Sequence, residues 1–139
     1  MPRLKIPSPD KWLFSTTLTV RVADLNYGNH IANERVLAYA QEARVRYFKS
    51  IDASELNFFG TSMIQGDAAI VYQSEGFLGD LIAIELGVMD VSNSSFDIVC
   101  QMYNRTTDKP LAKVKARIVC FDYDNRKVCP VPQAFIELL

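Results

Sequence analysis

The residues best suited to chemistry gather in one short segment, residues 24–33, which reads DLNYGNHIAN. Asp24 can accept a proton, whereas Asn26 can orient a polar group but cannot take up a proton at neutral pH. His30, the only histidine in the chain, can donate a hydrogen bond or exchange a proton. These side chains could position a water molecule and move its proton, so the segment is a candidate catalytic loop.

A helix is expected directly after this loop. From Ala32 onward apolar residues, including Val36, Tyr39 and Ala43, recur at spacings of three and four, which predicts an amphipathic helix over residues 32–50. The start of a helix presents unpaired N–H groups and the positive end of its dipole, and both suit a carbonyl oxygen that gains negative charge. The loop and the helix start therefore form one candidate site.

The same residues also permit a purely structural interpretation. Asn29 and Asn33 are both suitable as N-cap residues, and Gly28 could supply a positive φ for the turn. His30 would then fill an ordinary hydrogen-bonding role. The residue types alone leave both interpretations open.

Two further groups of charged residues could take part in chemistry. Glu42, on the expected helix, could act as a general base if burial raised its pKa, or it could be a solvated, ion-paired residue. Lys113, Lys115 and Arg117 alternate along an expected strand and could receive the phosphates of a nucleotide-like carrier, or could simply face solvent.

The rest of the chain is patterned for strands. Apolar and polar residues alternate over residues 14–22, before the helix, and further strands are expected at 68–74, 82–88, 96–103 and 112–120. Short turns between the later strands imply antiparallel pairing. The order predicts an α+β fold, in which a five-stranded antiparallel sheet carries one long helix on one face. Its exposed edges favour self-association.

Composition sets the outer limits. A chain of 139 residues with 49% hydrophobic content predicts a single domain, with residues 1–12 as an extended arm. A net charge of −1 gives no overall attraction to nucleic acid or an anionic membrane, and without a leader or spanning segment we expect a cytoplasmic protein. Three cysteines without paired spacing predict no metal site, and no cofactor motif is present; Cys100 and Cys120 are expected in the core.

Four stretches of the sequence resemble the hot-dog-fold acyl-CoA thioesterases, in the group similar to 4-hydroxybenzoyl-CoA thioesterase. They are VADLNYGNHIANERVLAYAQEARVRYF, GDAAIVYQSEGFLGDLIAIELGV, MYNRTTDKPLAKVKARIVCFD and NRKVCPVP, and they cover the chain from about residue 13. The family loop commonly reads D-x-D-x-x-G-H-[VI]-x-N and leads into a helix with E-A-R. Asp24 then stands at the first acid, and Glu42 begins the E-A-R.

This sequence departs from the family loop at two positions. Asn26 replaces the second acid, which is the working carboxylate in many relatives, and Asn29 stands at the glycine position, one residue after Gly28. The resemblance implies hydrolysis of an acyl-CoA thioester at the interface of a homodimer or a dimer of dimers. It also implies oxyanion donors among the backbone N–H groups of residues 31–33, that is Ile31, Ala32 and Asn33.

Asn26 and His30 would then bind the attacking water or the thioester oxygen, while Asp24, or alternatively Glu42, supplies basicity. Two other functions fit the sequence. A non-catalytic acyl-CoA or acyl-carrier binding protein would explain the amide at position 26, and an enoyl-CoA hydratase of the same fold would share a related D-x-N-P-x-H loop. The acyl group is not identified, although five residues could line an apolar tunnel or belong to the core: Phe58, Phe59, Met63, Tyr72 and Phe77.

Overall fold

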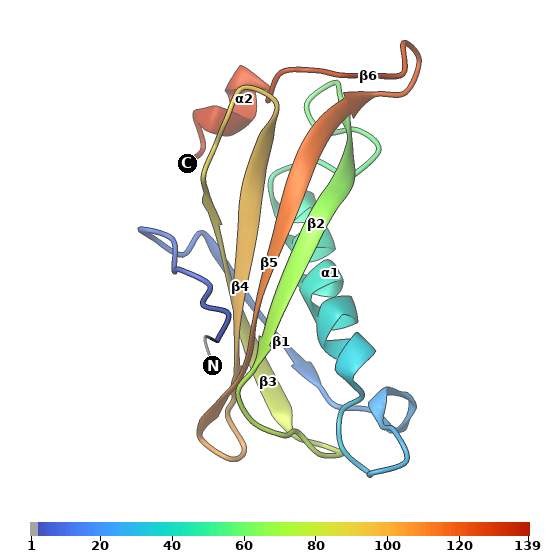
Figure 1. Ribbon diagram of the computed structural model, residues 1–139, viewed down its shortest axis with the longest axis vertical. Coiled ribbons are helices and arrows are strands. Elements are labelled where there is room, and N and C mark those ends of the chain that lie inside the picture. The colour runs from blue at the N-terminus through green and yellow to red at the C-terminus, as the bar shows by residue number, and fades with distance from the viewer. Residues whose placement is uncertain (1–2) are drawn as a thin grey trace.

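The computed structural model describes residues 3–139 and consists of one curved sheet and one long helix (Figure 1). The elements, in chain order, are β1 (Phe14–Thr19), the 3-10 helix η1 (Val22–Asp24), α1 (Asn33–Ser50), β2 (Ser62–Tyr72), β3 (Leu81–Met89), β4 (Ser95–Asn104), β5 (Lys109–Asp122), β6 (Lys127–Val128) and α2 (Gln133–Ile136).

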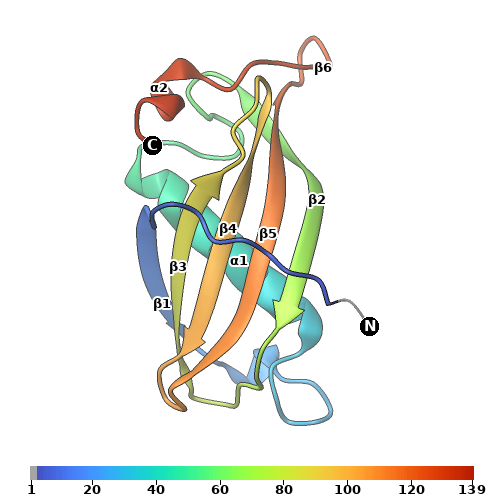
Figure 2. The ribbon, with the colours of Figure 1, turned by 60° about the vertical axis from the view of Figure 1, so that its left-hand side comes forward.

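The sheet has the strand order β1-β3-β4-β5-β2, every neighbouring pair is antiparallel, and the short β6 pairs with the end of β5. Helix α1 lies along the concave face of the sheet, and its start lies at the same end of the molecule as the β2–β3 connection (Figures 1 and 2). The expected α+β architecture, an antiparallel sheet wrapped around one long helix, is confirmed.

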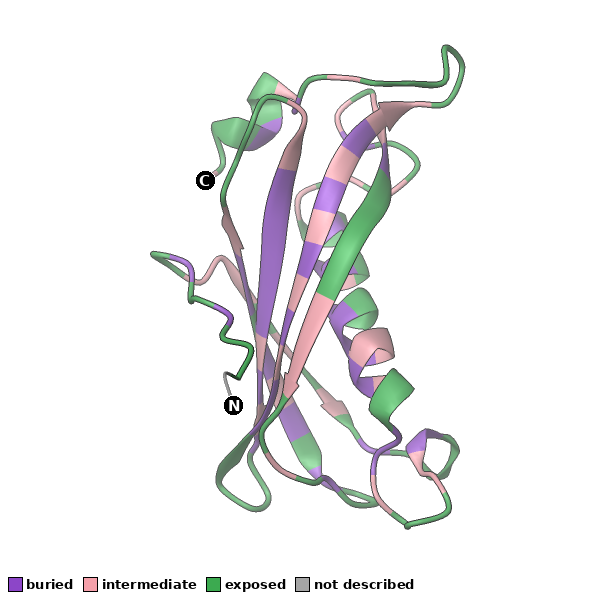
Figure 3. Ribbon diagram, in the orientation of Figure 1, coloured by how far each residue is buried: buried purple, intermediate pink, exposed green. Residues whose placement is uncertain are grey.

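The alternation of side chains explains why α1 lies on this face. Ile84, Cys100 and Val114, from three neighbouring strands, are all buried on the concave side and belong to the same core cluster as Ala43 of the helix. Figure 3 shows the central strand β4 as the most continuously buried element. The expected core positions of Cys100 and Cys120 are confirmed, since both thiols are buried.

Most strands differ from the expected ranges by up to three residues at an end and β2 by more, and two of the differences have a clear physical reason. The first strand ends at Thr19 rather than at residue 22, because the N–H of Val20 donates to Asp80 and the chain then turns into η1. The second strand begins at Ser62 rather than at residue 68, and a bulge at Gly66 shifts its register. The bulge interrupts the alternation that marks a strand in sequence, which hides the first half of β2.

The apolar residues considered for a tunnel divide between two ends of the molecule. Phe58 is fully buried against Phe48, Phe96 and Phe135, with ring centroids 4.7 to 5.8 Å apart, so it belongs to the core beyond the end of α1. Phe59 and Met63 pack at the same cluster. Tyr72 and Phe77, by contrast, are 51% and 44% exposed. A single tunnel through all five residues is therefore ruled out.

Residues 3–12 cross the convex face of the sheet as an extended segment, and residues 1–2 of the predicted arm lie outside the described part (Figure 2). The arm is seated at Gly87, where an added Cβ would lie 2.4 Å from the Pro9 ring and 2.9 Å from the Lys11 carbonyl oxygen. Ile6 and Pro9 are buried. Among residues 3–139, no helix has the length and apolarity needed to cross a membrane.

Candidate functional site

Backbone hydrogen bonds within the loop fix the conformation of the segment before α1. The Asn26 N–H donates to the His30 carbonyl, and the Asn29 N–H donates to the Asn26 carbonyl, each at 3.0 Å. Asn29 has a φ of 62°, whereas Gly28 does not have a positive φ. The expectation that Gly28 supplies the left-handed residue is therefore wrong. Asn29 takes that conformation, which asparagine tolerates better than most residues, at the position that matches the glycine of the family loop pattern.

Gly28 instead keeps a small space open between two polar groups. An added Cβ at Gly28 would lie 3.1 Å from His30 Nε2 and 3.3 Å from Asn26 Oδ1. The two side chains therefore flank the same point above the glycine. Asn26 Oδ1 accepts the Gly28 N–H at 2.9 Å, which leaves the Asn26 amide N–H groups without an acceptor among residues 3–139.

The His30 ring is oriented by its own backbone neighbour. His30 Nδ1 lies 3.0 Å from the Ile31 carbonyl oxygen, which can only accept, so Nδ1 carries the proton of this hydrogen bond. In the neutral ring Nε2 is then an unprotonated acceptor, and it is the atom that faces the space beside Gly28. The arrangement gives the loop a proton acceptor that needs no carboxylate.

The start of α1 offers fewer free N–H groups than expected. The Ile31 N–H donates to the Gly76 carbonyl and the Ala32 N–H to the Asp24 carbonyl, both at 2.9 Å, so neither is available to an oxyanion. Within residues 3–139, the N–H groups of Asn33 and Glu34 have no acceptor. Of the three expected donors, Ile31, Ala32 and Asn33, only Asn33 has an N–H without an acceptor in this part of the chain, and the Glu34 N–H is free as well.

Neither asparagine caps the helix as expected. The N-cap position is Ala32, which makes no side-chain capping bond, and Asn33 is already the first helical residue. The N–H groups of Asn33 and Glu34 therefore stay unpaired, whereas the Arg35 N–H donates to the Ala32 carbonyl at 2.9 Å. Unpaired N–H groups at a helix start can bind a developing negative charge. The start of α1 therefore lacks the side-chain cap that Asn29 or Asn33 was expected to supply.

The β2–β3 connection packs against the candidate loop and the start of α1. Tyr72 donates from its hydroxyl to the Asn33 carbonyl at 3.1 Å, and His30 pairs with Phe77 in an isolated β-bridge. At Gly76 an added Cβ would lie 2.4 Å from Ile31 Cδ1, so this glycine allows the close approach of the two segments. Buried Asp80 holds the connection by accepting the Phe77 N–H at 2.9 Å.

Asp24 lies behind the helix start rather than in the space beside His30. Its carboxylate is 1% exposed and accepts the Tyr39 hydroxyl at 2.8 Å, the Arg21 N–H at 3.0 Å and the Arg21 guanidinium at 3.3 Å. Burial by itself raises the pKa of Asp24, but the hydrogen bonds from Arg21 and Tyr39 outweigh it and lower the pKa overall. Asp24 is thus an anion whose charge is stabilised by hydrogen bonds within the fold.

The E-A-R residues of α1 are distributed around the helix. The Glu42 side chain is 51% exposed and pairs with Arg46 at 2.8 Å, so the burial that would make it a strong base is absent. Ala43 is fully buried in the core. Arg44 is buried and ties the helix to Glu55 and to Gln65 of β2, at 3.3 and 3.1 Å.

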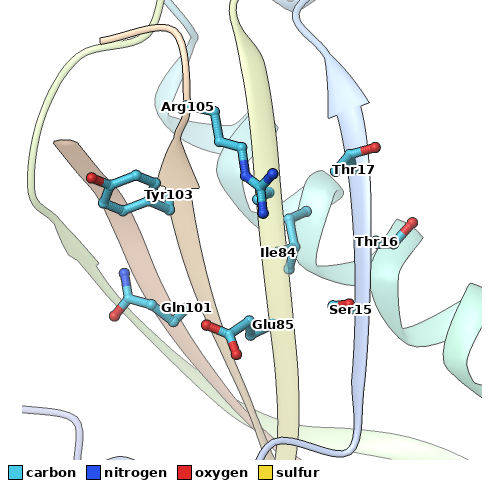
Figure 4. Close-up of a pocket in the computed structure, with 9 residues that line it drawn as sticks. Ser15, Thr16, Thr17, Ile84, Glu85, Gln101, Tyr103 and Arg105 are labelled. Carbon is cyan, nitrogen blue, oxygen red and sulfur yellow. The ribbon is translucent and has the colours of Figure 1, made fainter. Parts of the chain in front are cut away.

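The other groups considered from the sequence lie on the convex face. Lys115 pairs with Asp67 at 2.8 Å and Arg117 with Asp97 at 3.1 Å, so these cations are neutralised within the sheet. A polar pocket of about 650 Å³ lies on the same face, between β1, β3 and β4, and includes Glu85 and Arg105 (Figure 4). It opens away from α1 and from the candidate loop.

Sequence reasoning missed Tyr39 and Gly76. Tyr39 follows the helical apolar spacing and is indistinguishable in sequence from an ordinary core residue, although its hydroxyl holds Asp24. Gly76 lies in a glycine-containing connection where nothing local signals contact with Ile31. Both roles depend on segments far apart in the chain, so the only available signal is a polar atom on an otherwise apolar helix face.

Comparison with known proteins agrees with this architecture. The sequence model of the thioesterase-like superfamily matches residues 20–139. No curated protein matches the chain significantly. Similar solved structures include a 1,4-dihydroxy-2-naphthoyl-CoA thioesterase from Synechocystis, which is 20% identical with a TM-score of 0.82 over 90% of this chain and 93% of that one.

Two further structures share the fold at comparable similarity. A predicted thioesterase from Bacillus stearothermophilus is 23% identical, with a TM-score of 0.78 over 90% of this chain and 92% of that chain. A thioesterase from Thermus thermophilus, complexed with coenzyme A and Zn, is 22% identical, with a TM-score of 0.78 over 91% and 97%. The match to the family model extends over most of the chain, and the chain therefore belongs to the thioesterase-like superfamily.

Proposed function

We propose that the protein hydrolyses an acyl-CoA thioester to a carboxylic acid and CoA at the start of α1. The observation that carries this proposal is that His30 Nε2 and the Asn26 side chain flank the same point beside Gly28, in the loop that leads into a helix start with unpaired N–H groups. A proton acceptor, a polar donor and an oxyanion-binding helix end are the parts that hydrolysis of a thioester requires.

In the proposed reaction His30 Nε2 accepts a proton from a water molecule as the water oxygen attacks the thioester carbonyl carbon. The N–H groups of Asn33 and Glu34 hold the carbonyl oxygen as it becomes an oxyanion. The Asn26 amide donates to the attacking water or to the thioester oxygen. Collapse of the tetrahedral intermediate breaks the C–S bond, and the proton on His30 passes to the departing thiolate.

Asp24 takes a positioning role in this scheme. Its carbonyl holds the Ala32 N–H, and its carboxylate ties η1 to Tyr39, so it fixes the direction in which the loop meets the helix. Its lowered pKa makes it a weaker base than an ordinary carboxylate. Glu42 is farther along the exposed side of α1 and is held by Arg46.

The choice of a CoA thioester rests on the chemistry of similar proteins. Structures with the same fold include the Thermus thermophilus thioesterase complexed with coenzyme A and a Staphylococcus aureus protein in complex with CoA, the latter 16% identical with a TM-score of 0.80. A CoA thioester is therefore the first substrate class to assay.

We further propose that the working form is a homodimer built on β2. This edge strand is mostly exposed and, among residues 3–139, no strand pairs with its outer side. Its Ala68 is exposed and its Ile70 is only partly buried. An unpaired edge of this length favours pairing with another strand. Because Tyr72 at the end of β2 contacts Asn33, a second copy on this edge would lie beside the start of α1.

A thiol-release assay across short, long and aromatic acyl-CoAs tests the function, with His30→Ala and Asn26→Ala as the informative variants. We expect His30→Ala to lower kcat by about a hundredfold or more, as loss of a general base does. His30→Ala should keep the wild-type melting temperature within a few degrees, because the ring is only half buried. Tight acyl-CoA binding without thiol release in the wild type would instead favour a binding protein, the function that the amide at position 26 suggests.

A further inference from the structure

A second pocket, on the opposite flank of α1 from β2, gathers arginines from three places in the chain. It has a volume of about 350 Å³ and is lined by Arg21 after β1 and by Arg35 and Arg46 of α1. Asp24, Tyr39 and Glu42 also line it. Arginine is the residue that most readily binds planar or tetrahedral oxyanions, because its guanidinium donates several hydrogen bonds in a fixed geometry.

The three guanidinium groups are not equally engaged. Arg46 is held firmly by the Thr16 hydroxyl at 2.7 Å, by the Thr17 carbonyl at 2.8 Å and by Glu42. Arg21 reaches Asp24 at 3.3 Å and is otherwise exposed. Arg35 is half buried and has neither a hydrogen bond from its guanidinium nor an ion pair within residues 3–139.

The charges of the pocket favour an anion. Its three guanidinium groups outnumber its two carboxylates, those of Asp24 and Glu42. The Asp24 carboxylate also accepts hydrogen bonds from the Tyr39 hydroxyl and the Arg21 N–H, which use part of its capacity. The Arg35 guanidinium reaches solvent, since no buried polar side-chain atom of residues 3–139 lacks a hydrogen-bond partner, and it is free to bind an incoming anion. A tetrahedral oxyanion in this pocket could accept hydrogen bonds from Arg35 and from the exposed Arg21.

We propose that this arginine-lined pocket binds the phosphoryl group of a small molecule. The phosphoryl group has two possible sources, the carrier portion of the substrate or a separate phosphorylated molecule. The pocket borders the helix start through Asp24, whose carbonyl bonds the Ala32 N–H, so either source would lie next to the proposed thioester site. The site itself stands independently of the proposed hydrolysis, and only the first source rests on it.

Inorganic pyrophosphate, titrated calorimetrically into the full-length protein, tests the site without any turnover. We expect Arg35→Gln to weaken pyrophosphate binding at least tenfold and Glu42→Gln to strengthen it, because the latter removes a negative charge from the pocket. Arg105→Gln is the matched control, since it removes the same charge from the pocket on the convex face. Absence of pyrophosphate binding in the wild type, or equal losses in Arg35→Gln and Arg105→Gln, would overturn the proposal.

Steady-state kinetics then distinguish the two sources. If the substrate supplies the phosphoryl group, Arg35→Gln raises the KM for an acyl-CoA several-fold but leaves the KM for the matching acyl-pantetheine, which lacks phosphate, unchanged. If a separate molecule supplies it, Arg35→Gln weakens pyrophosphate binding and changes neither KM. Lack of turnover with every thioester would refute the proposed function and leave the calorimetric result valid.

Discussion

The bond between Asp24 and Tyr39 offers the sharpest test of the site, because it separates positioning from catalysis. In Asp24→Asn an amide must turn its NH₂ toward a donor, since both carboxylate oxygens now accept hydrogen bonds. Tyr39→Phe removes one of those donors and leaves the charge in place. A buried hydrogen bond to a charged group contributes about 1.5 to 3 kcal/mol, so each variant should lose roughly 2 kcal/mol of stability.

Guanidinium denaturation of the single and double variants measures this loss. Because both substitutions break the same bond, we expect the double variant to lose about 1 to 2 kcal/mol less than the sum of the single losses. The sign of the pH dependence follows from the lowered pKa of Asp24. Its contribution is fully present above the unfolded pKa of about 4 and is lost as the pH falls through the lower folded value.

The thiol-release assay, run well below the melting temperature of each variant, gives the second readout. A positioning role predicts that both single variants retain kcat within roughly tenfold of the wild type and keep the shape of its pH profile. If Asp24→Asn loses about a hundredfold or more while folded, and Tyr39→Phe does not, Asp24 is the base and the assignment to His30 is wrong.

Three further substitutions probe the same end of the molecule and the β2 edge. Gly28→Ala should lower kcat/KM at least tenfold with little change in melting temperature, because its Cβ enters the space between Asn26 and His30. Gly60→Ala, at a φ of +93° with no atom nearby, should instead lower the melting temperature and leave kcat/KM unchanged. Gly76→Ala should cost about 1 to 3 kcal/mol by displacing Ile31, measured by denaturation. Ala68→Lys should shift the protein from dimer to monomer in light scattering, whereas Ser15→Lys on the opposite edge strand should not.

The sequence predicts the elements well where one physical rule acts alone. The alternation from Ile82 to Val88 and the helical spacing from Ala32 to Tyr47 both identify their elements, because each buries a single face. The first half of β2 escapes prediction because the bulge at Gly66 and an edge position remove the alternation. Local pattern is informative only where burial follows a regular period.

The location of the candidate site can be predicted from the sequence, but most of its hydrogen bonds cannot. The segment 24–33 can be found from residue types, and its meeting with the helix start follows from chain continuity. The role of Asp24 cannot be predicted in this way, because it depends on contacts with Tyr39 and Arg21 and on how deeply the carboxylate is buried. The exchange of roles between Gly28 and Asn29 is equally hidden, since both residues suit a turn and only the backbone angles distinguish them.

The strand order has a consequence for how the chain folds as it is made. Helix α1 emerges early, yet the strands beneath its middle come later, and β2 finds its partner β5 only after residue 109 has been synthesised. Pairings so distant in sequence close large loops, which slows folding and leaves apolar surfaces exposed in the meantime. A nascent chain that stops before β5 therefore presents both the buried face of α1 and the edge of β2, and we expect it to depend on chaperones.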